Sequence, residues 1–145
     1  MVWPSLKPFV IGEPDAPYMK RWFVLPRNKW FNVYLHHFHR SDDDRALHDH
    51  PWKNLSVLLR GSYLEYLPDG STLVRNPTLA FWRWPVREAT DSHRVELING
   101  RKVWTLFITG RRVRVWGFWC PKGWIPWTEL VEQTSGGNKQ GKGCD

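Results

Sequence analysis

The chain contains 145 residues, 41% of them hydrophobic, and carries 21 Lys or Arg against 14 Asp or Glu, for a formal net charge of +7. This length predicts one domain with one site, since it leaves no room for separate catalytic and binding domains. No stretch approaches the roughly 20 apolar residues that span a bilayer, and residues 1–15 lack the features of a signal peptide. We therefore expect a cytoplasmic protein without a membrane segment.

The basic residues are unevenly distributed. Six Lys or Arg and no acidic residue occur between Leu97 and Thr128. Such a stretch could attract a small polar or anionic substrate, although solvated strand faces also carry charge. No motif that reads nucleic-acid bases is recognisable, so nucleic acid is an unlikely partner.

The two cysteines, Cys120 and Cys144, are too few for a disulfide framework. We expect neither to be structural, because Cys144 lies in a Gly- and Lys-rich tail.

In chain order, an N-terminal arm (residues 1–19) precedes a run of short extended segments rich in β-branched and aromatic residues. These segments occupy residues 20–25, 30–39, 54–61, 62–67, 72–76, 79–84, 93–98, 102–109 and 112–119. The connections "PDGS" and "NGR" have the composition of tight hairpin turns. The pattern predicts an all-β sandwich or barrel over residues 20–134, with a short helix in "IPWTELVEQ" and a flexible tail from 135 to 145.

Two histidines open the central part of the chain. In "ALHDHPWKNLSVLLRG", His48 and His50 are two residues apart, so they project from one face if this segment is extended. Two such imidazoles can converge on one metal ion from the interior of a barrel. A third ligand is required, because the pair alone is a weak motif.

The spacing from His48 to Gly61 resembles the first motif of the cupin family, in which HxH is followed by an acidic residue and then a glycine. "EATDSHRVELING" resembles the second cupin motif and makes His93 the candidate third ligand. The segments "LHDHPW", "GSYLEY", "SHRVEL" and "WGFWCPKGW" are similar to those of small cupin-domain proteins of bacteria and phages. The resemblance covers about residues 20–120. It implies a double-stranded β-helix, a jelly-roll barrel with a divalent transition metal inside one end.

The chain departs from the cupin pattern at two places. Asn54 occupies the acidic ligand position, and the proline and glycine that usually precede the second-motif histidine are absent. The resemblance then implies three neutral histidine ligands, as in three-His cupins such as thiol dioxygenases, unless Glu65 also reaches the site. Fe(II) is favoured, and Ni, Zn, Mn or Cu are alternatives, because imidazole nitrogen suits several of these metals.

Other polar residues are candidates for acid–base or substrate-binding roles. His37 and His39 share one face of "YLHHFH" and could line the cavity, whereas His36 lies on the opposite face and is assigned no role. Tyr63 and Glu65 share a face beyond Gly61 and would supply a phenol and a carboxylate near the metal if that face points inward. The alternative for each pair is a place on the outer surface of the barrel.

These features predict a metal-dependent cupin enzyme, an oxygenase or dioxygenase acting on a small polar molecule. A metal-independent sugar-type isomerase or epimerase in the same barrel is one alternative. A non-catalytic module that binds a small ligand or nucleic acid is another. Homodimer formation through sheet edges also fits the sequence.

Overall fold

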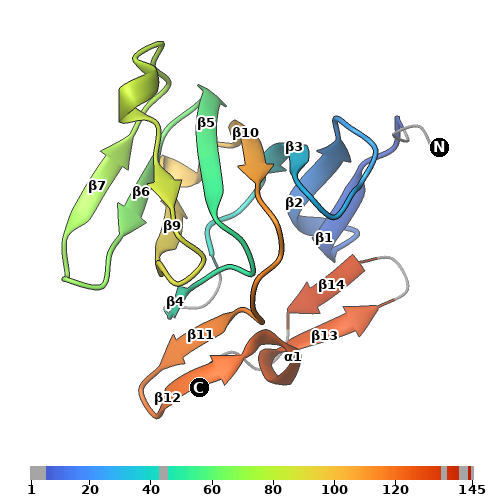
Figure 1. The fold of residues 1–145 in the computed structure, drawn as a ribbon, viewed down its shortest axis with the longest axis vertical. Helices are drawn as coiled ribbons and strands as arrows, with labels where there is room; N and C mark the ends of the chain where they lie inside the picture. Colours follow the sequence, from blue (N-terminus) through green and yellow to red (C-terminus); the bar gives the residue numbers. More distant parts are fainter. Residues whose placement is uncertain (1–5, 43–45, 135–136, 141–143, 145) are drawn as a thin grey trace.

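The structure is a computed structural model that describes residues 6–42, 46–134, 137–140 and 144. It is built almost entirely of antiparallel strands (Figure 1). The largest sheet has the order β1 (Phe9–Glu13), β2 (Ala16–Phe23), β3 (Asn32–Phe38), β10 (Val103–Thr109), β5 (Asn54–Arg60) and β8 (Val86–Arg87). None of the helices in the described part of the chain has the length and hydrophobicity to span a bilayer.

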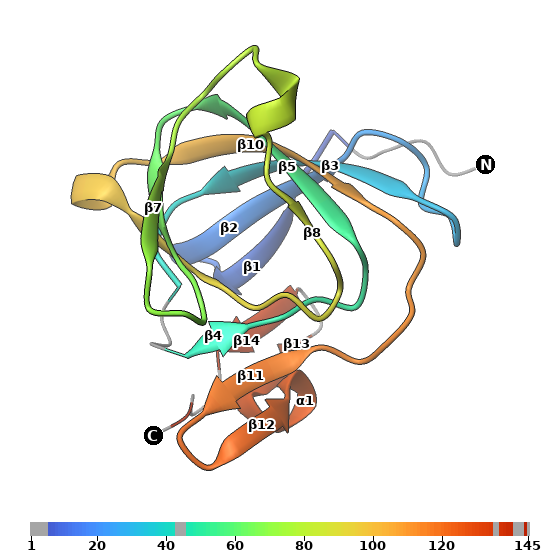
Figure 2. The ribbon, with the colours of Figure 1, turned by 60° about the vertical axis from the view of Figure 1, so that its left-hand side comes forward.

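The facing layer consists of two three-stranded sheets. One has the order β7 (Thr72–Arg75), β6 (Tyr63–Tyr66) and β9 (Arg94–Leu97), and the other has the order β12 (Gly123–Pro126), β11 (Gly117–Cys120) and β4 (Leu47–His48). A single antiparallel bridge between His48 and His93 joins the two sheets. Figure 2 shows how this layer and the largest sheet enclose the interior. The all-β barrel prediction is therefore confirmed.

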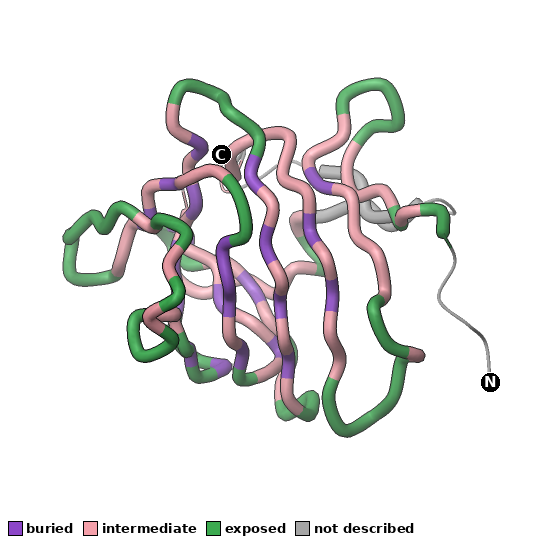
Figure 3. The backbone as a smooth tube through the Cα atoms, turned by 90° about the horizontal axis from the view of Figure 1, so that it is seen from above, coloured by how far each residue is buried: buried purple, intermediate pink, exposed green. Residues whose placement is uncertain are grey.

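The alternation of side chains along the strands explains the core. In β10, Val103, Thr105, Phe107 and Thr109 are buried while the residues between them are partly exposed. Figure 3 shows buried and partly exposed positions interspersed along the strands of the molecule. Leu58, Tyr63, Val95, Leu97 and Val103 form the main apolar cluster. This cluster fills the end of the barrel next to β6 and β9.

The predicted turns form as expected. Gly70, in the "PDGS" turn between β6 and β7, has a φ of 83°, and the Asp69 carboxylate accepts a hydrogen bond from the Ser71 amide at 2.8 Å. Between β9 and β10, Asn99 and Gly100 have φ values of 53° and 65° within a 3₁₀ turn, Ile98–Gly100. Glycine and asparagine tolerate this left-handed region, which explains why these residues occupy the turns.

Several predicted elements are different in the structure. Residues 79–84 were expected to form a strand, but they contain an exposed 3₁₀ turn, Phe81–Arg83. The expected strand at 112–119 begins only at Gly117. The C-terminal helix α1 has a single turn, Trp127–Leu130, before strand β13 (Val131–Thr134).

Both ends of the chain contain paired strands. The predicted N-terminal arm supplies β1 and the start of β2, which extend the largest sheet at its edge. Within the predicted tail, β14 (Gly137–Gln140) pairs with β13 and lies beside β1. Residues 135–136, 141–143 and 145 of that tail lie outside the described residues.

Cys120 and Cys144 form a disulfide, with their Cα atoms 5.3 Å apart. The prediction that neither cysteine is structural is therefore wrong. Two distant positions in the sequence meet because the C-terminal segment returns to the end of β11.

Candidate metal centre

Three histidines from two strand ends and a loop meet inside the barrel. His48 ends β4 and exchanges two backbone hydrogen bonds with His93, each of 2.9 Å. His50 lies in the loop after β4, where its amide donates to the Ala89 carbonyl at 3.1 Å. The ring centroids of the three imidazoles lie 4.8 to 5.2 Å apart, and one nitrogen of each ring lies within 4.8 Å of the other two.

The histidines line a cavity of about 330 Å³. Its wall combines aromatic side chains such as Phe107 and Trp116 with a few polar groups, among them Tyr63 and Arg21. This volume is at the lower end of the range for small-molecule sites. A ligand here must therefore be small.

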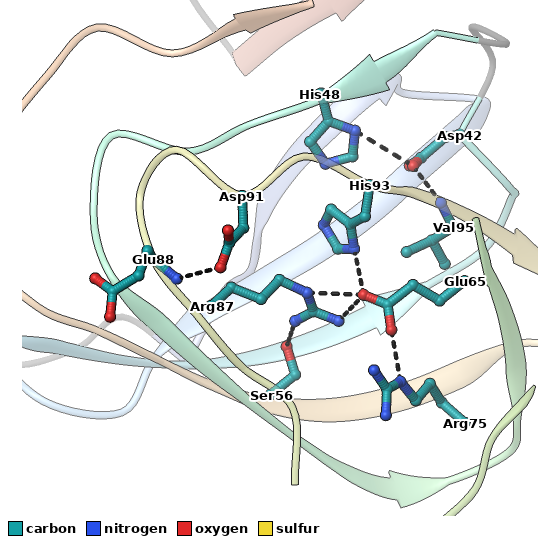
Figure 4. Close-up of polar contacts among 10 residues, drawn as sticks. All are labelled: Asp42, His48, Ser56, Glu65, Arg75, Arg87, Glu88, Asp91, His93 and Val95. Atoms are coloured by element: carbon teal, nitrogen blue, oxygen red, sulfur yellow. Dashed lines mark hydrogen bonds and ion pairs between the residues drawn. The ribbon is translucent and has the colours of Figure 1, made fainter. Parts of the chain in front are cut away.

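A buried carboxylate holds His93 in place. Glu65 has no solvent exposure, and its Oε1 lies 2.9 Å from His93 Nδ1 (Figure 4). Arg87 and Arg75 donate to the two carboxylate oxygens, with Nε–O distances of 2.7 and 2.5 Å. Because Nδ1 of His93 faces Glu65, Nε2 is the nitrogen available to a metal.

A second carboxylate lies beside His48. Asp42 Oδ2 is 3.5 Å from His48 Nδ1 and accepts a hydrogen bond from the Val95 amide at 2.7 Å (Figure 4). Tyr18 donates its hydroxyl proton to the other oxygen of Asp42. Two of the three imidazoles thus have carboxylates on their outer side, an arrangement that orients metal-ligating histidines in other proteins.

Burial and neighbouring charges keep the imidazoles of His50 and His93 neutral. Burial, followed by the positive charge of Arg87, lowers the pKa of His93 to about 4, although its hydrogen bond to Glu65 acts in the opposite direction. Burial and the neighbouring His48 hold the pKa of His50 well below its ordinary value. Burial raises the pKa of Glu65, but the hydrogen bond to His93 and the charge of Arg87 outweigh it, and the carboxylate stays ionised.

These residues fit a divalent transition metal. Metal–imidazole bonds of about 2.1 Å require ligand nitrogens a few ångströms apart, and the three rings approach this separation. Neutral histidine is the form that coordinates. His50 Nδ1 is buried and has no hydrogen-bond partner, which leaves a polar atom that a ligand would satisfy.

No family model and no curated protein matches this sequence. Among solved structures, a cupin superfamily protein from Desulfitobacterium hafniense aligns with a TM-score of 0.51 and 14% identity, over 64% of this chain and 77% of that chain. The polyketide cyclase RemF from Streptomyces resistomycificus aligns with a TM-score of 0.56 and 19% identity, over 75% and 80% of the two chains. The chain has a cupin fold.

A structure of the DMSP lyases RdDddP and RnDddQII also aligns, with a TM-score of 0.50 and 14% identity, over 63% of this chain. The present chain spans about half of that chain, 47% of its length. At these identities the similarity establishes the double-stranded β-helix and no shared reaction.

The structure places His37 and His39 outside the cupin cavity. His37 stacks on Trp104 with ring centroids 3.9 Å apart, and His39 Nε2 lies 3.0 Å from His37 Nδ1. His36, which was assigned no role, is buried and lines the cavity. The expectation that His37 and His39 line the cavity is wrong because β3 has the opposite register, which the sequence alone does not fix.

Tyr63 and Glu65 both point into the cupin barrel, but their surroundings differ. Tyr63 is 3% exposed and lines the cavity, and burial raises the pKa of its phenol. Glu65 lies behind His93, with both oxygens engaged by His93 and two arginines. Tyr63 therefore remains a candidate acid or base, whereas the engaged oxygens of Glu65 favour a role in positioning His93.

Three residues that line the cavity, Asp42, Arg21 and His36, were not identified as cavity residues from the sequence. Asp42 belongs to the acidic run Asp42–Asp44, which suggests a solvated turn, and Asp43 and Asp44 lie outside the described residues. Arg21 and His36 pair directly across β2 and β3. Their joint position on the inner face could have been found only by fixing the register of both strands.

Asn54, which occupies the acidic ligand position of the first cupin motif, is buried but does not line the cavity. Its Nδ2 donates to the Trp52 carbonyl at 3.3 Å.

Proposed function

We propose that this protein is a metal-dependent cupin enzyme in which His48, His50 and His93 hold one divalent transition metal ion. The convergence of three imidazole nitrogens at a small cavity carries this proposal. Fe(II) is favoured. Ni, Zn and Cu have ligand preferences that the same nitrogens satisfy, whereas Mn, a further alternative, more often takes oxygen ligands.

A metal with three histidine ligands would keep open positions for a substrate group and, with iron, for dioxygen. Residues of the chain itself orient the ligands and line the cavity. Glu65 fixes the orientation of His93, and the carboxylate of Asp42 lies 3.5 Å from His48 Nδ1. Aromatic side chains such as Trp116 and Phe118 line the cavity.

An oxygenase or dioxygenase reaction on a small polar molecule is the first candidate for the chemistry. A proton-transfer reaction is the second, and the buried phenol of Tyr63 in the cavity favours it. A phenol whose pKa is raised by burial keeps its proton at neutral pH and can donate it to a substrate atom. A polyketide cyclase and DMSP lyases are among the proteins with this fold.

Elemental analysis of protein purified without an affinity tag or chelator tests the proposal. We expect about one transition metal ion per chain, and its loss in the His93→Ala variant. His37→Ala is the matched control, because its imidazole lies outside the cavity and its removal should leave the metal content unchanged. Metal content below a tenth of an ion per chain, both as purified and after reconstitution with Fe(II) or Zn²⁺, would instead support the metal-independent isomerase.

The reaction class is tested with the reconstituted protein. Substrate-dependent consumption of dioxygen indicates an oxygenase. Solvent deuterium incorporation without oxygen consumption, abolished by Tyr63→Phe, indicates proton transfer. Similarity to the small bacterial and phage cupin proteins does not decide between these classes, because one fold supports many reactions.

A further inference from the structure

A guanidinium group faces the same cavity as the histidine cluster. Arg21 of β2 lies directly opposite His36 of β3, and its Nε donates to His36 Nε2 at 2.9 Å. The guanidinium carbon also lies 4.6 Å from the centre of the Tyr34 ring. A hydrogen bond and a cation–π contact thus fix the orientation of this side chain.

Arg21 has no anionic partner among the described residues. The carboxylates that line the cavity are engaged elsewhere: Asp42 by Val95, Tyr18 and His48, and Asp49 by the Gly117 amide, the Trp124 indole and Arg114. Burial lowers the pKa of Arg21 to about 10, so the group stays charged at neutral pH. Arg21 is partly buried, and a charged group with reduced access to water and no counter-ion is unfavourable, so an incoming anion would relieve this cost.

His36 keeps the guanidinium available for such an anion. Burial, followed by the charge of Arg21, holds the pKa of His36 well below its ordinary value, so its Nε2 is a neutral acceptor. Because the contact with His36 uses Nε, the terminal nitrogens of Arg21 remain as donors. Paired N–H groups of a guanidinium match the two oxygens of a carboxylate.

Arg21 and the metal-ligand cluster are close enough for one small molecule to reach both. The His36 and His50 rings pack on the same residue, Phe107, with centroid distances of 5.1 and 6.1 Å. Both histidines line the one cavity of about 330 Å³. One aromatic ring therefore separates the cationic end of the cavity from the histidine cluster.

We propose that Arg21 binds the carboxylate of a small organic acid, whose reactive end extends to His48, His50 and His93. The assignment of that reactive end rests on the proposed function. His36 is a positioning residue that orients Arg21.

Binding of malonate to the metal-free protein tests the carboxylate site without contributions from a metal. We expect malonate to shift the Arg21 Nε–H resonance in ¹⁵N–¹H spectra of the wild-type protein, and uncharged malonamide to leave it unchanged. Arg21→Met should weaken malonate binding about 10- to 100-fold, the usual effect of losing a hydrogen-bonded charge. Arg101→Met is the matched control, because Arg101 is exposed and does not line the cavity.

The positioning role of His36 has its own variants. His36→Ala should weaken malonate binding, and His36→Gln should restore part of it because the amide oxygen can accept the Arg21 Nε proton. Equal malonate affinity in Arg21→Met and wild type would overturn the inference. If Arg21→Met does not fold, an Arg21 resonance of the wild-type protein that stays unshifted at saturating malonate would still overturn the inference. Tighter binding of inorganic phosphate than of malonate would rule out a carboxylate ligand.

Zn²⁺ titration separates this inference from the proposed function. Arg21→Met should bind Zn²⁺ as wild type does, because it contacts no ligand histidine. Zn²⁺ binding without malonate binding would refute the carboxylate site alone. Malonate binding at Arg21 without Zn²⁺ binding would refute the metal centre and leave the carboxylate site in place.

Discussion

Two pairs of histidines with the same spacing have different environments in this protein. His48 and His50 face the cavity, where His93 completes a cluster of three. His37 and His39 lie on the outer side of β3, where their ring nitrogens are 3.0 Å apart and no third ligand joins them among the described residues. Identical spacing therefore does not make a metal site: the strand face and a contribution from a distant strand decide it.

The surroundings of the two pairs differ as much as their positions. The inner cluster is backed by Glu65, which contacts His93 Nδ1 at 2.9 Å, and by Asp42, whose Oδ2 lies 3.5 Å from His48 Nδ1. The outer pair is backed by Trp104, which offers a flat apolar surface and no acceptor. Burial, then the adjacent His39, lowers the pKa of His37 to about 4, so this pair is also neutral at pH 7. Neutrality alone therefore does not identify the site.

The largest expected effect is on metal binding. His93→Ala removes one of three ligands, so we expect the Zn²⁺ affinity to fall by more than the 10- to 100-fold typical of outer-shell changes. Isothermal titration calorimetry measures this loss, while circular dichroism checks that the β-sheet signal is retained. An unchanged Zn²⁺ affinity in His93→Ala would contradict the proposal that His93 completes a metal site with His48 and His50.

Glu65→Ala should reduce both stability and metal affinity. It leaves Arg87 buried without its counter-ion, and breaking such a buried pair costs about 3–5 kcal/mol. Loss of the acceptor for His93 Nδ1 should also weaken Zn²⁺ binding about 10- to 100-fold. Urea unfolding and calorimetry measure the two effects. Glu88→Ala is the control: its ion pair with Lys53 is exposed and should contribute at most about 1 kcal/mol.

The metal-free protein should lose stability as the pH falls from about 6.5 towards 4. The folded-state pKa of His93 is about 4, below its unfolded value, so the unfolded chain binds more protons in this window. Stability is unaffected by this group above pH 7 and decreases on acidification by an amount on the order of a few kcal/mol. Urea midpoints at a series of pH values should fall less steeply in His93→Gln than in wild type. Parallel curves for the two proteins would contradict a neutral, buried His93.

The smallest effect is expected for the outer pair. His37→Ala removes a ring that stacks on Trp104, a contact worth about 0.5–1.5 kcal/mol, and should leave Zn²⁺ affinity unchanged. A urea unfolding curve and a calorimetric titration of the same sample check both expectations. A fall in Zn²⁺ affinity would show that the two pairs are coupled through β3.

The sequence by itself determined the strand-rich fold, because side-chain alternation and turn residues such as Asp69, Gly70 and Gly100 are local signals. The HxH pair and the cupin-like spacing also singled out His48, His50 and His93 as a set. Only the tertiary structure decided which face of β3 points inward, since a shift of one residue exchanges His36 for its neighbours. Other features depend on contacts between residues 15 or more positions apart. They are the contact of Glu65 with His93, the hydrogen bond from Arg21 to His36, and the Cys120–Cys144 disulfide. Such contacts follow from how the strands pair and face each other, which local propensity does not specify.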